Sequence, residues 1–217
     1  MNNALYIIAT PIGNLGDITL RAIEALKNVE YIFCEDCRVS SKLIKHLSIE
    51  KKLISCNAHT EKHKINNILK FLTEGKSVAY ISDAGTPGLS DPGNLIVNKI
   101  AEQGFKIIPI PGVSSLSCLI SVCGFNLSSG FFFCGFFPRK QGKFKKLIET
   151  NEILFGFESP YRIKKTLEFL AENCPEAEIC LGRELTKLYE EVLRAKAKDF
   201  VNMQIKEKGE FVLGICK

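Results

Sequence analysis

The stretch from Ser82 to Gly93 has the residue types of a ligand-binding loop. It reads S-D-A-G-T-P-G-L-S-D-P-G and follows the apolar run Val78–Ile81 directly. Glycine lets a backbone approach a ligand closely, and proline fixes the path of the chain. A plain strand-to-helix turn takes roughly two to six residues. We therefore interpret this longer stretch as a binding loop, the alternative being a tight turn without a ligand.

Two further loops share this composition. Thr10–Asp17 follows an apolar run at 5–9, and Pro111–Ser115 follows another at 105–108. Because ligands of open α/β sheets bind at the carboxyl ends of strands, we expect the three loops to meet at one edge. The chain contains neither Gly-x-Gly-x-x-Gly nor a complete P-loop motif, so we do not expect the ligand to be held by its phosphates.

A basic run follows the phenylalanine-rich stretch 131–137. It holds five cations and no acid within eight residues, whereas the whole chain of 217 residues has a net charge of +5. A solvated surface is one interpretation, and a phosphate-binding patch for nucleic acid is the other. The five cations are Arg139, Lys140, Lys143, Lys145 and Lys146.

The nine cysteines are expected to be reduced thiols. The sequence starts without a secretory leader and has no apolar run near the ~20 residues that span a bilayer, so a cytoplasmic location is expected. Cys34 and Cys37 have the spacing of half a zinc site, but no second pair completes it. His59 and His63 lack a third ligand. We therefore predict no metal.

The elements that position the loops alternate between strands and amphipathic helices. This alternation predicts an α/β fold with a mostly parallel sheet in the first half. The expected strands are 5–9, 31–34, 78–81 and 105–108, and the expected helices are 19–28, a short one starting at Ser40 and Ser41, 60–75 with Thr60 as its cap, and 95–104.

The pattern changes near 110–114, which predicts two α/β domains, 1–112 and 113–217, the second with a mixed sheet. Ser159-Pro160 is expected to start a helix, with proline at the first helical position. The phenylalanine run is interpreted as core or dimer interface rather than as a base-stacking platform. The remaining expected elements are a helix at 114–123 and strands at 153–157, 179–181, 192–193 and 211–215.

Long motifs along the chain resemble those of the tetrapyrrole methylase superfamily. Within it, they are most similar to the bacterial enzymes that methylate the ribose 2′-hydroxyl of a cytidine in 16S ribosomal RNA. The resemblance runs nearly from end to end. The motifs are 5–17, E-D-x-R at 35–38, 82–93, G-F-F-P at 135–138, F-E-S-P-Y-R at 157–162 and R-E-L-T-K at 183–187.

The resemblance implies a two-lobed homodimer that binds S-adenosylmethionine between its lobes. Pro11 and Gly13 would shape the floor beneath the substrate, and Phe157 would lie near the adenine. The loop backbone from Ser82 would take the methionine part, and Val113 and Ser114 would lie near the sulfonium or the carboxylate. The full implied cofactor set is Pro11, Gly13, Ser82, Asp83, Ala84, Gly85, Pro87, Val113, Ser114 and Phe157.

Two departures from the family pattern bear on these expectations. The third loop reads Gly112-Val113-Ser114-Ser115, where relatives usually have Gly-Pro-Ser/Cys-Ala, which leaves the ligand set there less defined. The C-terminal extension common in such enzymes is expected to be absent here. If that extension helps to hold ribosomal RNA, substrate affinity or choice would differ.

Methyl transfer to a ribose hydroxyl needs alignment and a base, but no metal. Glu158 is our first candidate for the base, and its alternative role is to pair with Arg162 four residues on. The other candidates are Glu35, Asp36, Asp83, Glu184 and Glu190. The cations expected to grip RNA phosphates, besides the basic run, are Arg38, Arg162, Arg183 and Lys187, although Arg183 and Glu184 could instead belong to a structural network.

The predicted partner is 16S ribosomal RNA or the small ribosomal subunit, and the predicted cofactor is S-adenosylmethionine. One alternative is a methyltransferase of the same superfamily that acts on a tetrapyrrole, and the basic run argues against it. The other alternative is a non-catalytic RNA- or ribosome-binding protein that has kept the fold.

Overall fold

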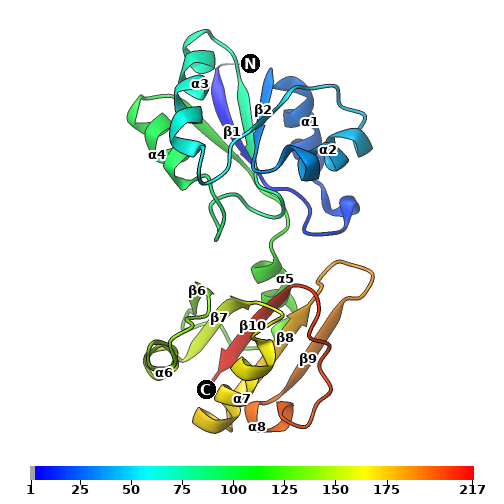
Figure 1. Cartoon of the computed structure of the whole chain (residues 1–217), viewed down its shortest axis with the longest axis vertical. Coiled ribbons are helices and arrows are strands. Elements are labelled where there is room, and N and C mark those ends of the chain that lie inside the picture. The colour runs from blue at the N-terminus through cyan, green and yellow to red at the C-terminus, as the bar shows by residue number, and fades with distance from the viewer. Residues whose placement is uncertain (1–2) are drawn as a thin grey trace. The chain divides into compact units, whose positions relative to one another are not determined.

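The computed structural model describes residues 3–217 and divides the chain into two compact units, Met1–Ser114 and Ser115–Lys217. The boundary expected after residue 112 lies two residues before this division. Each unit contains a five-stranded sheet with helices packed on it (Figure 1).

The first unit has a parallel sheet with the strand order β3-β2-β4-β1-β5. Every residue of β4 is buried, as expected for a strand whose sheet is covered on both faces. The strands are β1 Ala4–Ile8, β2 Tyr31–Cys34, β3 Leu53–Ser55, β4 Val78–Ile81 and β5 Lys106–Ile110.

Helices cover both faces of this sheet. Leu26 and Ile44, from α1 (Leu20–Asn28) and α2 (Cys37–His46), share one core cluster. Ile68 and Ile96, from α3 (Glu61–Thr73) and α4 (Asn94–Glu102), belong to the core cluster on the other face. A short 3-10 helix, η1 (Leu15–Asp17), lies in the first loop. Because helices cover both faces of the sheet, the connecting loops lie at the ends of the strands (Figure 1).

Two helix starts in the first unit differ from the predictions. α2 begins at Cys37 rather than near Ser40, because the side chain of Asp36 accepts the N–H of Arg38 and caps the helix. Thr60 precedes α3 but does not cap it, since its hydroxyl accepts the N–H of Asn57 instead. The short edge strand β3 was not predicted.

The second unit has a mixed sheet with the order β6-β7-β10-β8-β9. β6 runs parallel to β7, and the other pairs are antiparallel. The predicted fold class, a parallel sheet followed by a mixed one, is therefore confirmed. The elements are α5 Ser115–Cys123, β6 Phe132–Phe136, α6 Gln141–Thr150, β7 Ile153–Glu158, α7 Ile163–Asn173, β8 Glu178–Arg183, β9 Glu191–Lys196, α8 Ala197–Phe200 and β10 Phe211–Cys216.

One core of the second unit lies between the sheet and three helices. Phe144 of α6, Leu167 of α7 and Phe200 of α8 all belong to it, together with Leu213 of β10. α5 packs against β8 and β10, where Leu119 lies against Gly182. Both faces of the central strands are thus covered.

The start of α7 was predicted wrongly. The helix begins at Ile163, because the carbonyl of Ser159 accepts the N–H groups of both Arg162 and Ile163 and closes a turn first. Pro160 therefore lies in that turn and not at the first helical position. α6 was also missed: its segment was interpreted by its charge, although Phe144, Leu147 and Ile148 have the i, i+3, i+4 spacing of a buried helix face. No helix within residues 3–217 is long and apolar enough to cross a membrane.

Candidate functional site

Three loops of the first unit meet at the carboxyl ends of β1, β4 and β5. Thr10 and Gly85 form an antiparallel bridge, with N···O distances of 2.9 and 3.0 Å. Gly85 has a φ of +72°, and a Cβ there would lie 3.3 Å from Cγ2 of Ile12 and 3.9 Å from the carbonyl oxygen of Val113. The structure therefore brings together the Thr10–Asp17, Ser82–Gly93 and Pro111–Ser115 loops, and only a glycine fits comfortably where they touch.

Gly112 of the third loop is also packed tightly, against Ala9 after β1. A Cβ on Gly112 would lie 2.9 Å from Cβ of Ala9. Ser82 is buried, its carbonyl accepts the hydroxyl of Thr10 at 3.4 Å, and its own hydroxyl donates to the carbonyl of Ala84 at 3.2 Å. These contacts fix the backbone of the loops.

Part of the long loop folds against α3 and α4. The buried carboxylate of Glu61 accepts the N–H groups of Gly93 and Ile96 at 3.1 and 3.2 Å, which caps α4 from a neighbouring helix. Asn94 donates its amide to the carbonyl of Gly88. The loop is therefore an ordered element rather than a plain turn.

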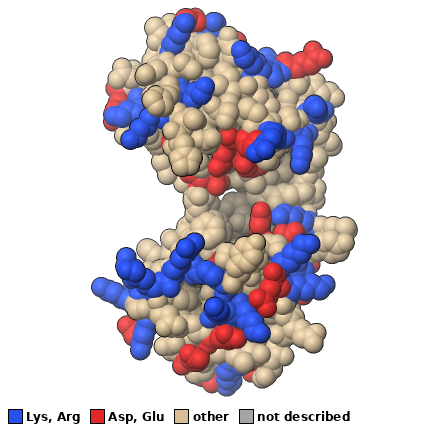
Figure 2. Space-filling model, viewed as in Figure 1, with Lys and Arg blue, Asp and Glu red and all other residues tan. Residues whose placement is uncertain are grey.

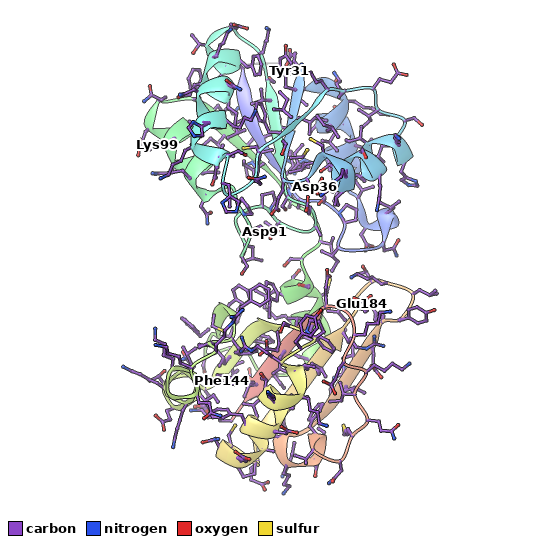
Figure 3. The ribbon with its side chains drawn as sticks, viewed as in Figure 1. Tyr31, Asp36, Asp91, Lys99, Phe144 and Glu184 are labelled. Carbon is purple, nitrogen blue, oxygen red and sulfur yellow. The ribbon has the colours of Figure 1, made fainter. Side chains whose placement is uncertain are left out.

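Acidic residues that follow β2 and β4 lie at this end of the sheet. The backbone N–H of Asp36 donates to Oδ1 of Asp83 at 2.9 Å. Burial and the nearby charge of Asp83 raise the pKa of Glu35. Figure 3 shows Asp36 and Asp91 at this end of the first unit, and Figure 2 shows acidic surface there. The edge therefore offers negative charge to a ligand.

Arg38, expected to grip phosphate, is paired with a carboxylate. Its guanidinium donates to both oxygens of Asp36, with the shortest N···O distance 2.6 Å. These hydrogen bonds lower the pKa of Asp36 to about 2. The arginine side chain is nevertheless 90% exposed. A phosphate would compete with Asp36 for the same donors.

In the second unit, Glu158 lies at the end of β7 with a fully buried carboxylate. It accepts hydrogen bonds from the N–H of Ser159 at 2.7 Å, the guanidinium of Arg162 at 3.0 Å and the hydroxyl of Thr166 at 2.6 Å. Arg162 also donates to the carbonyl of Phe137 at 3.0 Å. These contacts support the alternative role of Glu158, pairing with Arg162, and its role as a base stays a prediction.

Arg183 belongs to a structural network. It is buried, and its guanidinium donates to the carboxylate of Glu191 at 2.9 Å and to the carbonyls of Lys208 and Tyr189 at 3.2 and 3.1 Å. Because its donors are used within the protein, we do not retain Arg183 among the phosphate contacts.

Lys187 is part of the same arrangement. Its ammonium contacts carboxylate oxygens of Glu184 and Glu210, both at 2.9 Å, and its side chain is only 24% exposed. The alternative interpretation of R-E-L-T-K as a network is therefore the one that the contacts support. To contact RNA as predicted, Lys187 would have to exchange one of these carboxylates for a phosphate.

The basic run forms a solvent-facing patch at the start of α6. Phe144 anchors the helix by stacking on Phe169, with ring centroids 5.1 Å apart and planes 20° from parallel. Among residues 3–217, the side chains of the run form no ion pair or hydrogen bond, and Figure 2 shows blue surface gathered there at the lower left. We call the exposed cations Arg139, Lys140, Lys143, Lys145 and Lys146 the α6 patch.

The phenylalanine run has mixed environments. Phe137 is buried in the core, whereas Phe132 and Phe136 of the edge strand β6, and Phe131 just before it, are exposed. Phe157 is half-buried, and its ring meets those of Phe133 and Phe136 edge to face. The run therefore serves partly as core and partly as open surface.

Within residues 3–217, no group of three or more His, Cys, Asp or Glu side chains is arranged to hold a metal ion. Cys34 and Cys37 have their sulfurs 3.5 Å apart, and burial raises the pKa of Cys34 to about 12. All nine cysteines are free thiols. The reduced state is the one in which the structure describes them.

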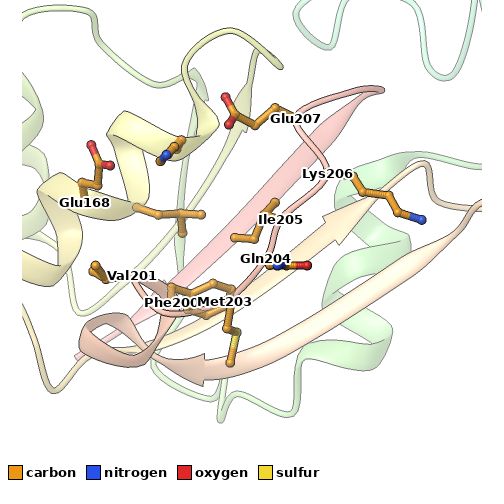
Figure 4. Close-up of a pocket in the computed structure, with 10 residues that line it drawn as sticks. Glu168, Phe200, Val201, Met203, Gln204, Ile205, Lys206 and Glu207 are labelled. Atoms are coloured by element: carbon orange, nitrogen blue, oxygen red, sulfur yellow. The ribbon is translucent and has the colours of Figure 1, made fainter.

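A hollow of about 470 Å³ lies in the second unit between α7 and the segment after α8 (Figure 4). Its mouth carries charges of both signs, and none of the expected site residues lines it. We therefore assign it no role in the reaction. The lining residues are Lys164, Leu167, Glu168, Phe200, Val201, Met203, Gln204, Ile205, Lys206 and Glu207.

Comparison with known proteins identifies the family. The family model described as Tetrapyrrole (Corrin/Porphyrin) Methylases matches residues 4–201. The chain belongs to the tetrapyrrole methylase family. Two crystal structures of low sequence identity share this fold of the family. One is a uroporphyrin-III-C-methyltransferase from Thermus thermophilus, with a TM-score of 0.70 and 17% identity, and the match covers 99% of this chain and 94% of that one. The other is a diphthine synthase, with a TM-score of 0.74 and 12% identity, and the match covers 99% of this chain and 90% of that one.

Curated members of the tetrapyrrole methylase family are much more similar in sequence. Three proteins named ribosomal RNA small subunit methyltransferase I illustrate the range. The protein from Borrelia garinii subsp. bavariensis is 48% identical over 98% of this chain and 98% of its own length. The protein from Thermotoga maritima is 40% identical over 94% of this chain and 93% of its own length. The protein from Bacillus subtilis is 38% identical over 96% of this chain and 73% of its own length.

Proposed function

We propose that this chain is an S-adenosylmethionine-dependent methyltransferase that modifies a ribose 2′-hydroxyl of a cytidine in 16S ribosomal RNA. The observation that carries the proposal is the meeting of three glycine- and proline-rich loops in a chain 48% identical to a ribosomal RNA small subunit methyltransferase I. With ribosomal RNA as its substrate, the enzyme would act in the cytoplasm.

The loops of the first unit fit the proposed cofactor chemically. Within residues 3–217, the backbone N–H groups of Gly13, Ala84 and Val113 make no hydrogen bond, so they are available to a carboxylate. Glu35 and Asp83 place negative charge beside them, which suits an ammonium or a sulfonium. S-adenosylmethionine has a carboxylate, an ammonium and a sulfonium. It therefore matches both the backbone N–H groups and the acidic side chains.

The proposed cofactor set follows from these loops. Pro11 and Ser82 are buried residues of the first and second loops, and Asp83 and Pro87 are partly exposed residues of the second. Ser114 continues the third loop, and Phe157 in the second unit stays a predicted contact to adenine. The tight packing at Gly85 holds the loops in a single arrangement, and such preorganisation lowers the cost of aligning the reacting groups.

When bound, S-adenosylmethionine would supply an electrophilic methyl group: the ribose oxygen would form a bond to the methyl carbon as the S–CH3 bond breaks and S-adenosylhomocysteine leaves. The part of this chain is to hold the loops rigid, to exclude water and to accept the proton that leaves the hydroxyl. Glu35 is a candidate acceptor in the first unit. Its pKa is raised above that of an ordinary glutamate, and a general base works best when its pKa is close to the working pH. Glu158 is already occupied by three donors.

The RNA contact is proposed for the α6 patch. Its five exposed cations have no hydrogen-bond or ion-pair partner among residues 3–217, so they can neutralise phosphates. A tetrapyrrole is the substrate of the alternative, and its carboxylates could also use cations. The high identity to proteins named as ribosomal RNA methyltransferases favours RNA.

We also propose that the protein is a homodimer. Phe131, just before the edge strand β6, and Phe132 and Phe136 within it are 45%, 43% and 59% exposed, and exposed large apolar side chains are a feature of interfaces. Sedimentation of the purified protein at several concentrations tests this, with a dimer expected throughout.

The function is tested by adding purified protein and methyl-labelled S-adenosylmethionine to small ribosomal subunits, and in parallel to uroporphyrinogen III. We expect label in 16S RNA and none in the tetrapyrrole. Label only in the tetrapyrrole supports the small-molecule alternative. Cofactor binding by calorimetry without any transfer would also contradict the proposal, and absence of cofactor binding would indicate a purely RNA-binding protein.

A further inference from the structure

Two tyrosine side chains of the second unit are exposed to an unusual degree. Tyr161, between β7 and α7, is 92% exposed, and Tyr189, between β8 and β9, is 68% exposed. Leu188, beside Tyr189, is 88% exposed. Exposed aromatic rings on ordered loops are typical of surfaces that contact a partner.

The loop that carries Tyr189 is held rigidly from within. Lys187 pairs with both Glu184 and Glu210 at 2.9 Å, and the N–H of Glu210 also donates to Glu184 at 2.9 Å. The N–H of Thr186 donates to the carboxylate of Glu190 at 2.5 Å. These bonds close the loop upon itself and upon the start of β10.

The buried guanidinium of Arg183 fixes the end of this loop. It donates to the carbonyl of Tyr189 at 3.1 Å, while Leu185 anchors the loop in the core. Glu184 and Thr186 have positive φ values of 50° and 69°, which residues other than glycine seldom adopt. Such strain persists where the surrounding contacts over-determine the backbone, and it is common at functional sites.

The loops that carry the two tyrosines lie at the same end of the strands of this sheet. Glu158 at the end of β7 and Arg183 at the end of β8 are both in register with Phe211 of β10. The two loops therefore leave the sheet at the same level, about 10 Å apart across one intervening strand. β6 runs parallel to β7, so its end, which leads into the α6 patch, lies at the same edge.

We propose that Tyr161 and Tyr189 are stacking platforms for unpaired bases of the RNA substrate, with the R-E-L-T-K motif as the rigid mount of Tyr189. The inference rests on the proposed function and deepens it. RNA fits this edge better than a protein partner because the α6 patch supplies cations for phosphates beside the rings. The Tyr189 loop itself has its cation Lys187 already paired, so it suits base contact rather than phosphate contact.

The test compares RNA binding of single and double Tyr161→Ala and Tyr189→Ala variants with that of Tyr→Phe variants, using 16S RNA transcribed in vitro. We expect about a tenfold loss of affinity for each ring removed, no loss in the phenylalanine variants, and an unchanged salt slope, because stacking releases no counterions. Leu188→Ala is the matched control, since leucine has no π face, and it should keep its affinity within about twofold.

Each outcome decides between the alternatives. Equal affinity of wild-type protein and the double alanine variant overturns the inference and leaves the proposed function intact. A loss as large in Leu188→Ala, or a change of oligomeric state in the tyrosine variants, assigns the edge to a protein contact and also overturns it. If the wild-type protein binds cofactor but has no affinity at low salt for either 16S RNA or small ribosomal subunits, both proposals fail.

Discussion

Glu158 illustrates how one residue supports two interpretations. At the sequence level, a carboxylate at the end of a strand suits a base, and an arginine four residues later suits an ion pair. The structure shows a fully buried carboxylate with three donors, one of them Arg162. Removing one member of such a buried set costs more than its net contribution, because the partners lose their hydrogen bonds.

We therefore predict that Glu158→Ala lowers the free energy of unfolding by about 3 kcal/mol in urea. Thr166→Val, which removes only one donor, should cost about 1 kcal/mol. Methyl transfer, measured where both variants stay folded, should fall modestly. Unchanged stability together with abolished transfer would instead identify Glu158 as the base.

Glu35 gives a pH-dependent prediction. Its pKa is raised by burial and by the charge of Asp83, so the ionised carboxylate is less favourable in the folded than in the unfolded state. The contribution of Glu35 to the free energy of unfolding should therefore be most favourable below the ordinary glutamate pKa of about 4.3 and fall as the pH rises through the raised value.

Glu35→Gln removes that ionisation. We expect the variant to have a higher melting temperature than wild type at about pH 7 and nearly the same one at about pH 4, where the wild-type carboxyl is largely protonated. Glu24→Gln, which changes an exposed glutamate of α1, serves as the control. An equal response of the two variants at both pH values would contradict the assigned cause.

At the scale of elements, the packing of the three loops makes its own prediction. Gly85 and Gly104 both have positive φ values, +72° and +74°, but only Gly85 has neighbours within 4 Å of an added Cβ. Both alanine variants should lose about 1 kcal/mol of stability through strain. Calorimetry should show weaker S-adenosylmethionine binding for Gly85→Ala alone. Equal cofactor affinity in the two variants would show that the loops do not form the cofactor site.

The α6 patch predicts a change in salt dependence. Neutralising Lys143, Lys145 and Lys146 to glutamine should weaken 16S RNA binding and reduce the slope of log affinity against log salt by about 0.7–0.9 for each phosphate that is no longer neutralised. A matched triple variant at exposed lysines of the first unit should change the slope much less. The control residues are Lys27, Lys42 and Lys45. Equal slopes for wild type and the α6 variant would contradict the assignment.

Strands covered on both faces were predictable from the sequence, and helix starts fixed by a single capping group were not. β2 and β4 have continuous apolar runs because helices cover both faces of their sheet, so their bounds were predicted to the residue. The starts of α2 and α7 depend on which of several polar groups caps the first turn. Propensity favoured Ser40 and Ser159-Pro160, whereas the hydrogen bonds that form use the side chain of Asp36 and the carbonyl of Ser159.

The candidate site was predictable for a similar reason. Parallel strands bring their carboxyl ends to one edge, so the meeting of three loops followed from their order. The burial of Arg183 and the exposure of Tyr161 and Tyr189 did not, because they depend on which loop folds over which. The sequence contains all of these residues, but only the register of β7, β8 and β10 relates them.

At the scale of the whole molecule, fold and substrate are separate questions. The same fold occurs in a uroporphyrin-III-C-methyltransferase and a diphthine synthase at 17% and 12% identity. A fold that serves such different proteins does not decide the substrate. Identity of 38–48% to proteins named ribosomal RNA small subunit methyltransferase I favours RNA, and the α6 patch gives that choice a physical basis.

The most direct measurement is nucleoside mass spectrometry of 16S ribosomal RNA from cells with and without this protein. The account predicts one 2′-O-methylcytidine that is present in the first RNA, absent from the second and restored by the wild-type gene. An identical set of methylated nucleosides in both RNAs would contradict it.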